Sequence, residues 1–202
     1  MGKTGNREIM LEAAIKLLER GGEAAVRVDP VVDAASVTKP SLYHYFGDRD
    51  GLIVAAQAER YRRSLLYGMD DQREATERCQ SREEFMTIVR GWMEAITGPD
   101  GEERRRVRVE VLGSAASRPQ LRSQTSAMDT IAAAQLGDLL RVAQTRGWVQ
   151  TEFDLDVAAT WWYGMMNGRY LVEETQTPLV RREWDAIAVE ATLHLLFSTP
   201  PA

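Results

Sequence analysis

The sequence predicts an all-α fold of about nine helices. Over most of the 202 residues, apolar side chains recur at intervals of three and four, as they do along one face of an α-helix. Proline, glycine and helix-capping residues separate these stretches. No stretch alternates β-branched and polar residues between turn signals, so we expect no sheet. The chain is 44% hydrophobic and 27% charged, which is an ordinary globular composition, and it is long enough to bury a sizeable core.

Three short helices are expected within the first fifty residues. The first covers about residues 7–20, and the next two are expected to begin at the N-caps Asp29 and Thr38. Glycine ends a helix because it accepts the left-handed conformation, whereas proline is tolerated in the first turn. The other residues that mark these helix ends are Gly21, Gly22, Pro30, Pro40 and Gly47.

The rest of the chain is expected to form five or six longer helices. Residues 69–80 are charged and poorly periodic, and they are expected to form a loop. Ser81 and Glu84 form a capping box at the start of the helix that follows this loop. The expected helices cover about residues 48–68, 81–97, 100–116, 119–146, 154–174 and 181–197.

The third short helix has two different faces. Leu42 and Phe46 lie four residues apart, so they share a face and are expected to pack inward on Val31 and Val37. Successive helical residues are about 100° apart, so the intervening aromatic residues cannot all point inward as well. These residues are Tyr43, His44 and Tyr45.

The second and third short helices are separated by a tight turn, and the third has a polar start and an exposed aromatic run. This pattern predicts a DNA-binding helix-turn-helix. The first N–H groups of the third helix can face phosphate, and its polar side chains can donate to bases or to the DNA backbone. Two arginines flank the pair of helices. The predicted DNA contacts are Arg27, Thr38, Lys39, Pro40, Ser41, Tyr43, His44, Tyr45 and Arg49.

Charge and composition disfavour several other classes of protein. The net charge of −5 argues against non-specific coating of nucleic acid, although a local positive surface remains compatible with sequence-specific binding. The chain lacks the G-x-S-x-G, H-E-x-x-H, P-loop and dinucleotide-binding motifs, so we do not expect an enzyme. With two histidines and the single cysteine Cys79, we expect neither a metal site nor a cofactor.

The expected location is the cytoplasm. Residues 1–6 lack the apolar core of a signal peptide, and no apolar run reaches the roughly 18 residues that span a bilayer. A second basic stretch, Arg104 to Arg108, has Glu102, Glu103 and Glu110 beside it at helical spacing, and is expected to form a solvated, salt-bridged surface.

Methionine and tryptophan residues gather in the C-terminal part of the chain. They are compatible with ordinary core packing, and equally with an adaptable pocket for an apolar or aromatic small molecule. The candidate ligand-binding residues are Met86, Trp92, Met93, Met128, Trp161 and Met166.

Residues 7–52 resemble the TetR family of transcriptional repressors. The resemblance rests on Ala13, Ala14, Leu17, Leu18, Gly21, Val37, the run from Pro40 to Phe46, Arg49 and Leu52. It implies a helix-turn-helix DNA-binding domain over residues 1–50 and a helical ligand-binding and dimerisation domain over residues 51–202. It also implies that the last two helices pair across a two-fold axis. The candidate dimer contacts there are Ala158, Trp162, Met165, Arg169, Trp184, Ile187, Ala188, Ala191 and Leu195.

Three residues depart from the pattern of the family. Ser36 stands in the turn where the family usually has glycine, so a left-handed conformation there would be strained. Val32 replaces the usual alanine of the preceding helix, which would space the two helices slightly wider. Arg27 stands where threonine often binds phosphate, so any phosphate contact there takes a different route.

The resemblance implies a ligand-responsive repressor that binds double-stranded operator DNA as a homodimer, with its two recognition helices about 34–36 Å apart in successive major grooves. Because repression and activation need the same DNA contacts, a transcriptional activator or a dual regulator of the same fold remains an alternative. An architectural DNA-binding protein and a helical enzyme are the more distant alternatives.

Overall fold

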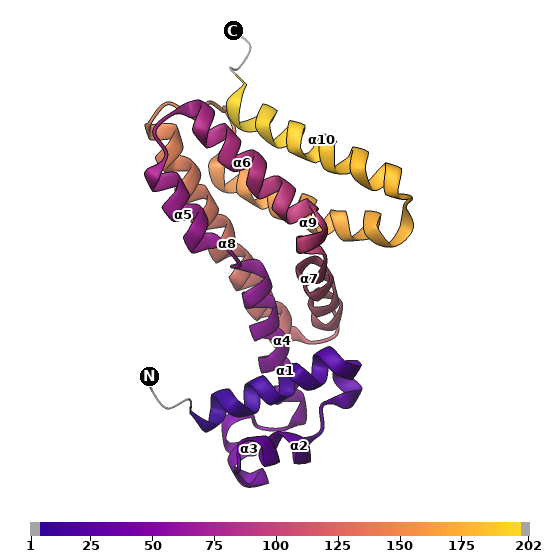
Figure 1. Cartoon of the computed structure of the whole chain (residues 1–202). Coiled ribbons are helices and arrows are strands. Elements are labelled where there is room, and N and C mark those ends of the chain that lie inside the picture. The colour runs from indigo at the N-terminus through magenta and orange to yellow at the C-terminus, as the bar shows by residue number, and fades with distance from the viewer. Residues whose placement is uncertain (1–4, 199–202) are drawn as a thin grey trace. The chain divides into compact units, whose positions relative to one another are not determined.

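The computed structural model describes residues 5–198, and these are almost entirely α-helical (Figure 1). No strand occurs within this range, so the predicted all-α fold class is confirmed. Residues 1–4, on which the expected absence of a signal peptide partly rests, lie outside the described residues. The elements are α1 (Asn6–Ala25), α2 (Val28–Ala34), α3 (Lys39–Phe46), α4 (Arg49–Leu65), α5 (Met69–Arg78), α6 (Arg82–Thr97), the 3-10 turn η1 (Pro99–Gly101), α7 (Glu102–Ala115), α8 (Pro119–Thr145), α9 (Leu155–Thr175) and α10 (Pro178–Phe197).

The chain divides into two compact units. The first contains the described residues up to Arg63 together with Val111–Thr125, and the second contains Ser64–Glu110 and the described residues from Ser126 onward. Helices α4, α7 and α8 therefore contribute residues to both units. The functions assigned from the sequence to residues 1–50 and 51–202 stay predictions.

One apolar core holds the first unit together. It is built from the inward faces of α1, α2, α3 and the first half of α4. Burying these side chains removes apolar surface from water, which is the main favourable contribution to folding. The fully buried members are Met10, Ala14, Val26, Val31, Leu42, Leu52, Ile53 and Ala56.

The N-terminal helices differ in detail from those expected. Gly21 and Gly22 are non-helical, as expected of helix-ending glycines, but a short helical stretch continues beyond them to Ala25. Helix α2 begins at Val28, so the N-cap position belongs to Arg27, and the prediction of Asp29 as its N-cap is wrong. Asp29 lies in the first turn, where a negative charge still interacts favourably with the helix dipole.

Residues 69–80 are not the loop that the sequence predicted, because Met69–Arg78 form α5. Only Met69 and Thr76 of this helix are buried, so its apolar period was too weak to detect. Gly68 precedes it in the left-handed conformation, with φ 75°. Cys79 follows it, and burial raises the pKa of its thiol.

In the second unit, α10 packs against α6 and α9 (Figure 1). The Ser81 side chain caps α6 by accepting from the Glu84 N–H, as predicted, but the Glu84 carboxylate reaches the N–H of Gln80 rather than that of Ser81. Asp154 caps α9 as predicted. Helix α10 starts three residues earlier than expected, at Pro178.

The arginines of α7 do not form the solvated surface that the sequence predicted. Arg105 is fully buried and Arg108 is 5% exposed. Arg105 forms an ion pair with Glu173 of α9 and donates to the backbone carbonyl of Gly98. Only Arg106 has the predicted partners, on its own helix. Within residues 5–198, no helix has both the length and the apolar character needed to cross a membrane.

Ser36 is strained by its position in the turn between α2 and α3. Its φ is 52°, the one positive value at a non-glycine residue among residues 5–198. Because left-handed backbone costs about 1–2 kcal/mol at a residue with a Cβ atom, Ser36→Gly should raise the free energy of unfolding by about 1 kcal/mol, measured by urea denaturation. The control Ser123→Gly, at an exposed helical position of α8, should lower it by about 0.5 kcal/mol. Equal effects of the two substitutions would contradict the assignment of strain.

Glu59 makes the first unit sensitive to acid. Its carboxylate accepts from Arg62 and Arg63, and Arg63 also pairs with Glu12 of α1. The hydrogen bond from Arg62 is the largest cause that lowers the pKa of Glu59 from 4.5 to about 2. The stabilisation is therefore complete above pH 4.5 and is lost as the pH falls toward 2.

Replacing this carboxylate should remove that pH dependence. We expect Glu59→Gln to lower the free energy of unfolding at pH 7 and to flatten its slope below pH 4.5. Denaturant titrations at several pH values measure both quantities. A variant with the same slope as the wild type would show that Glu59 does not carry the acid sensitivity.

Candidate nucleic-acid interface

The turn from α2 into α3 is held by backbone hydrogen bonds. The N–H of Ser36 donates to the carbonyl of Asp33 at 3.1 Å, and the N–H of Val37 donates to that of Val32 at 3.0 Å. Helix α3 then begins with Pro40 in its first turn. It ends at Gly47, whose φ of 80° suits glycine and whose N–H donates to the carbonyl of Tyr43. The short helix is thus fixed at both ends.

Helix α3 has the two faces that the sequence predicted. Leu42 is fully buried in the core, and Phe46 and Val37 pack against that core. The guanidinium of Arg7 lies over the Phe46 ring, 5.5 Å from its centroid. The opposite side, called here the exposed face of α3, carries the aromatic run and consists of Tyr43, His44 and Tyr45.

The N-terminal end of α3 is polar and accessible. Thr38 occupies the N-cap position, but its hydroxyl does not cap the backbone. The Thr38 Oγ1 lies 3.4 Å from the Oγ of Ser41 instead. Thr38, Lys39 and Pro40 are exposed and Ser41 is partly buried, so these hydroxyls are accessible to a ligand.

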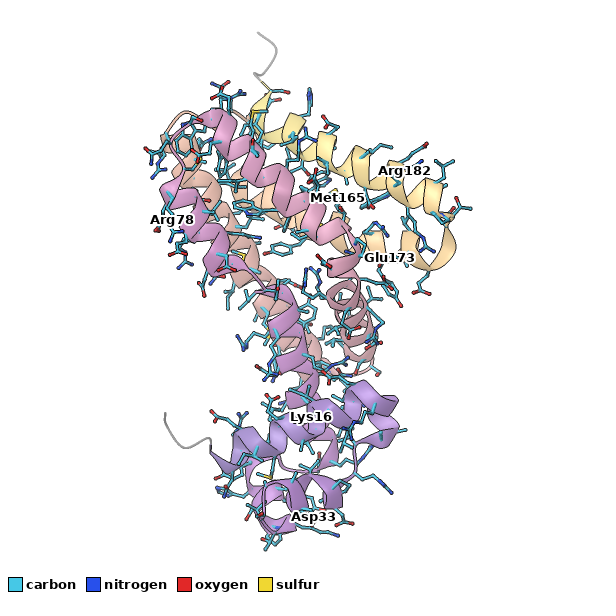
Figure 2. All side chains as sticks on the ribbon, viewed as in Figure 1. Lys16, Asp33, Arg78, Met165, Glu173 and Arg182 are labelled. Carbon is cyan, nitrogen blue, oxygen red and sulfur yellow. The ribbon has the colours of Figure 1, made fainter. Side chains whose placement is uncertain are left out.

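Lys39 is already paired with a carboxylate. Its Nζ lies 2.6 Å from Asp29 of α2, and both side chains are exposed. The hydrogen bond that Lys39 donates to Asp29 raises the pKa of Lys39, so its ammonium stays charged. Asp33 is also exposed on α2 (Figure 2). Any phosphate that approached Lys39 would therefore compete with a carboxylate of the protein itself.

The two flanking arginines differ in their surroundings. Arg27 is exposed at the start of α2 and does not cap that helix with its side chain. Arg49 donates from Nε to the carbonyl of Val26 at 2.6 Å and from Nη2 to the carbonyl of Glu23 at 2.5 Å. The hydrogen bonds of Arg49 therefore connect the start of α4 to the end of α1 and the residue that follows it. The sequence gives no sign of this role, because the carbonyls lie 23 and 26 residues upstream.

A polar cluster that the sequence did not reveal supports this motif from within the first unit. It is called here the Glu23 cluster and consists of Glu23, Gln57, Ser114 and Arg118. The Glu23 carboxylate accepts from Ser114 at 2.6 Å, from Arg118 at 2.8 Å and from Gln57 at 3.2 Å. Burial would raise the pKa of Glu23, but these hydrogen bonds outweigh it and the pKa is lowered. Arg118 also reaches Asp50, at 3.1 Å.

The candidate ligand-binding residues are scattered over different surroundings. Trp92 and Trp161 both line a small apolar cavity of about 30 Å³ in the second unit. Trp92 also lines a cavity of about 320 Å³, and Trp161 also lines an apolar groove. Met93 and Met166 are fully buried in the packed interior. Met86 and Met128 are partly buried and line neither the cavity nor the groove.

The candidate dimer residues fall into three groups, which are exposed, partly buried and buried. Ile187 is 68% exposed, and Ala191 is exposed nearby on α10. Trp162, Met165, Trp184 and Leu195 are partly buried. The remaining three are buried within the single chain, and Arg169 among them forms an ion pair with Asp185 of α10. Those three residues are Ala158, Arg169 and Ala188.

The comparisons with known proteins agree with this geometry. The family described as bacterial regulatory proteins, tetR family, matches residues 10–56. This range contains α2, α3 and the whole exposed face of α3. No curated protein matches the sequence.

Solved structures share the fold over nearly the whole chain. A chain from Mesorhizobium loti, assigned to the TetR-family transcriptional regulators, has 19% identity and a TM-score of 0.71, and covers 96% of this chain and 97% of its own. A similarly assigned chain from Rhodococcus sp. has 21% identity and a TM-score of 0.65, with 95% and 98% covered. A transcriptional regulator from Saccharomonospora viridis, solved with choline, has 17% identity and a TM-score of 0.64, with 95% and 97% covered.

At these identities the structural likeness establishes the fold, and the match over residues 10–56 identifies the motif that the fold presents. Residues 10–56 thus carry the helix-turn-helix motif of the tetR family of bacterial regulatory proteins, and the chain shares its fold with solved chains assigned to the TetR-family transcriptional regulators.

Proposed function

We propose that the protein is a ligand-responsive transcriptional repressor that binds operator DNA as a homodimer. The observation that carries the proposal is the exposed face of α3. Tyr43 and Tyr45 are 45% and 46% exposed while Leu42, on the same helix, is fully buried. The aromatic faces and hydroxyls of these tyrosines are therefore accessible beside the polar residues that begin α3.

The chemistry of this surface suits the major groove. Lys39 and Ser41 can donate to base edges, and tyrosine rings can contact thymine methyl groups. The hydroxyls of Thr38 and of the tyrosines can bind phosphate oxygens, which sets the register of the protein on the duplex. Arg27 adds a positive charge at the start of α2 and is proposed to contact phosphate.

Homodimerisation is supported by an apolar surface on α9 and α10. Val157 and Trp161 of α9 are 62% and 44% exposed, and Ile187 of α10 is 68% exposed. A groove of about 440 Å³ next to them is lined by Phe153, Val157, Ala158, Trp161, Ala191, His194 and Leu195. A monomer gains nothing from exposing such a surface, whereas a second copy that covered it would bury apolar area on both chains.

A response to ligand requires that binding in the second unit favour one arrangement of the recognition helices. Coupling of this kind is typically about 1–3 kcal/mol. Helices α4, α7 and α8, which contribute residues to both units, are the proposed carriers. The S. viridis relative, solved with choline, lends support to a small-molecule effector for this chain.

DNA binding is tested by titrating the protein onto duplex DNA from upstream of its own gene in gel-shift assays. Tyr43→Ala and Lys39→Ala should each weaken binding about tenfold or more if they contact the operator. Asp29→Asn should strengthen binding roughly two- to fivefold, because it removes the carboxylate that competes for Lys39.

The matched control is Lys16→Ala, which removes an exposed lysine from α1 (Figure 2). It should change affinity less than Lys39→Ala does. If Tyr43→Ala binds as tightly as the wild type, or if no upstream fragment binds at all, the proposed role of α3 is wrong.

Self-association is tested by sedimentation. Ile187→Asp should convert the dimer to a monomer, because it places a charge in the proposed apolar interface. The control Ile131→Asp changes an isoleucine of α8 that is 53% exposed, and it should leave the dimer intact. A wild-type monomer, or an equal loss of dimer in both variants, would contradict the α9–α10 interface.

A further inference from the structure

The wall of the cavity of about 320 Å³ in the second unit includes four aromatic rings. Residues from the α4–α5 junction, α6, α7 and α9 line it. Tyr67, Trp92, Trp162 and Tyr163 supply the rings. The rings of Trp162 and Tyr163 meet edge to face, with centroids 5.3 Å apart, so this part of the wall is well ordered. The volume lies at the lower end of ligand pockets, which span about 300–1,000 Å³, and it suits a molecule of one or two rings.

Two arginines of α7 give this aromatic wall a positive charge. Arg104 and Arg108 line the cavity, and Asp71 is the carboxylate among the lining residues. Arg108 is 5% exposed and donates from Nε to the carbonyl of Arg104. Arg108 therefore adds a second guanidinium group to this wall.

Arg104 is the residue best placed to bind an anion. Its guanidinium carbon lies 4.1 Å from the centroid of the Tyr67 ring, which fixes the plane of the side chain. The neighbouring Arg105 and Arg106 form ion pairs with Glu173 and with Glu103. Among the described residues, no carboxylate lies within ion-pair distance of Arg104, so its planar set of donors is available to a ligand.

Tyr163 adds a neutral donor to the same cavity. Burial raises the pKa of its phenol to about 12, so the hydroxyl keeps its proton at neutral pH. A protonated phenol can donate to an anion, whereas a phenolate would repel it. The wall thus combines flat apolar surfaces, two guanidinium groups and hydroxyl donors, among them the Tyr163 hydroxyl, which lies 3.9 Å from the Sδ of Met69.

We propose that this cavity binds an aromatic carboxylate, with its ring against the tryptophans and its carboxylate on Arg104. The inference rests on the proposed ligand response and names the chemical class of the effector. Guanidinium and carboxylate match in geometry and charge, and their hydrogen bonds are stronger than those between neutral groups. An aromatic cage can also hold a quaternary ammonium ion, but here the two arginines would repel it.

The test uses the full chain and isothermal titration calorimetry. The probes are 2-naphthoate, its uncharged primary amide and benzyltrimethylammonium. The wild type should bind 2-naphthoate at least about tenfold more tightly than the amide, and should bind the ammonium ion more weakly than either. Equal affinity for acid and amide, preference for the ammonium ion, or no binding of 2-naphthoate would overturn the proposal.

Substitutions of Arg104 test whether this residue binds the carboxylate of the ligand. Arg104→Gln should remove most of the preference for acid over amide, and Arg104→Lys, which keeps the charge but loses the planar donors, should keep part of it. Arg182→Gln, which removes an exposed arginine from α10 (Figure 2), is the control and should behave as the wild type. An unchanged preference in Arg104→Gln would overturn the assignment.

The same proteins separate this inference from the proposed function. Gel shifts with operator DNA report DNA binding without reference to the cavity. If 2-naphthoate does not bind while DNA does, the effector class is wrong and the DNA-binding function stands. If 2-naphthoate binds through Arg104 but leaves DNA affinity unchanged, the cavity is confirmed and the ligand response is contradicted.

Discussion

The burial of Leu42 beneath α3 is the constraint on which the candidate interface depends. A helix of this length cannot stand by itself in water, so α3 must attach one side to the core. Full burial of a leucine side chain contributes about 1.5–3 kcal/mol, and Phe46 extends the contact one turn further. Once Leu42 points inward, the 100° step of the helix turns Tyr43 and His44 outward, and Tyr45, about 60° from Leu42 around the helix, is 46% exposed. The same packing that stabilises α3 therefore presents its aromatic side chains.

The surroundings of α3 are held by polar contacts as well as by the core. Glu23 takes part twice, since its backbone carbonyl accepts from Arg49 and its carboxylate accepts from Ser114 and Arg118. The end of α1, the start of α4 and the segment Val111–Thr125 are thereby joined through one residue.

The sequence predicted the elements whose signals are local. Capping by Asp154 and Ser81, the stop at Gly98-Pro99 and the two faces of α3 depend on residues only a few positions apart, and all were found as expected. Helix α5 was missed because it buries only two residues.

Contacts between residues far apart in the sequence could not be predicted, for a different reason. Arg105 looked like a surface residue until Glu173, 68 positions away, was found beside it. Met93 is buried in the core and Trp92 lines the cavity, although the two residues are adjacent in the sequence. The spacing of apolar residues along the helix could not distinguish a core residue from a pocket residue. The same limit applies to Arg49, because a backbone carbonyl that accepts its hydrogen bond cannot be recognised from residue types.

We propose that the exposed face of α3 recognises a base sequence in duplex DNA. Selection of binding sites from a random duplex library by the full-length protein tests this recognition. We expect a near-palindromic consensus with half-sites about 10 base pairs apart, or a multiple of that spacing, and its loss when Tyr43, His44 and Tyr45 are all replaced by alanine. No enrichment by the wild type, or the same consensus from the triple variant, would contradict it.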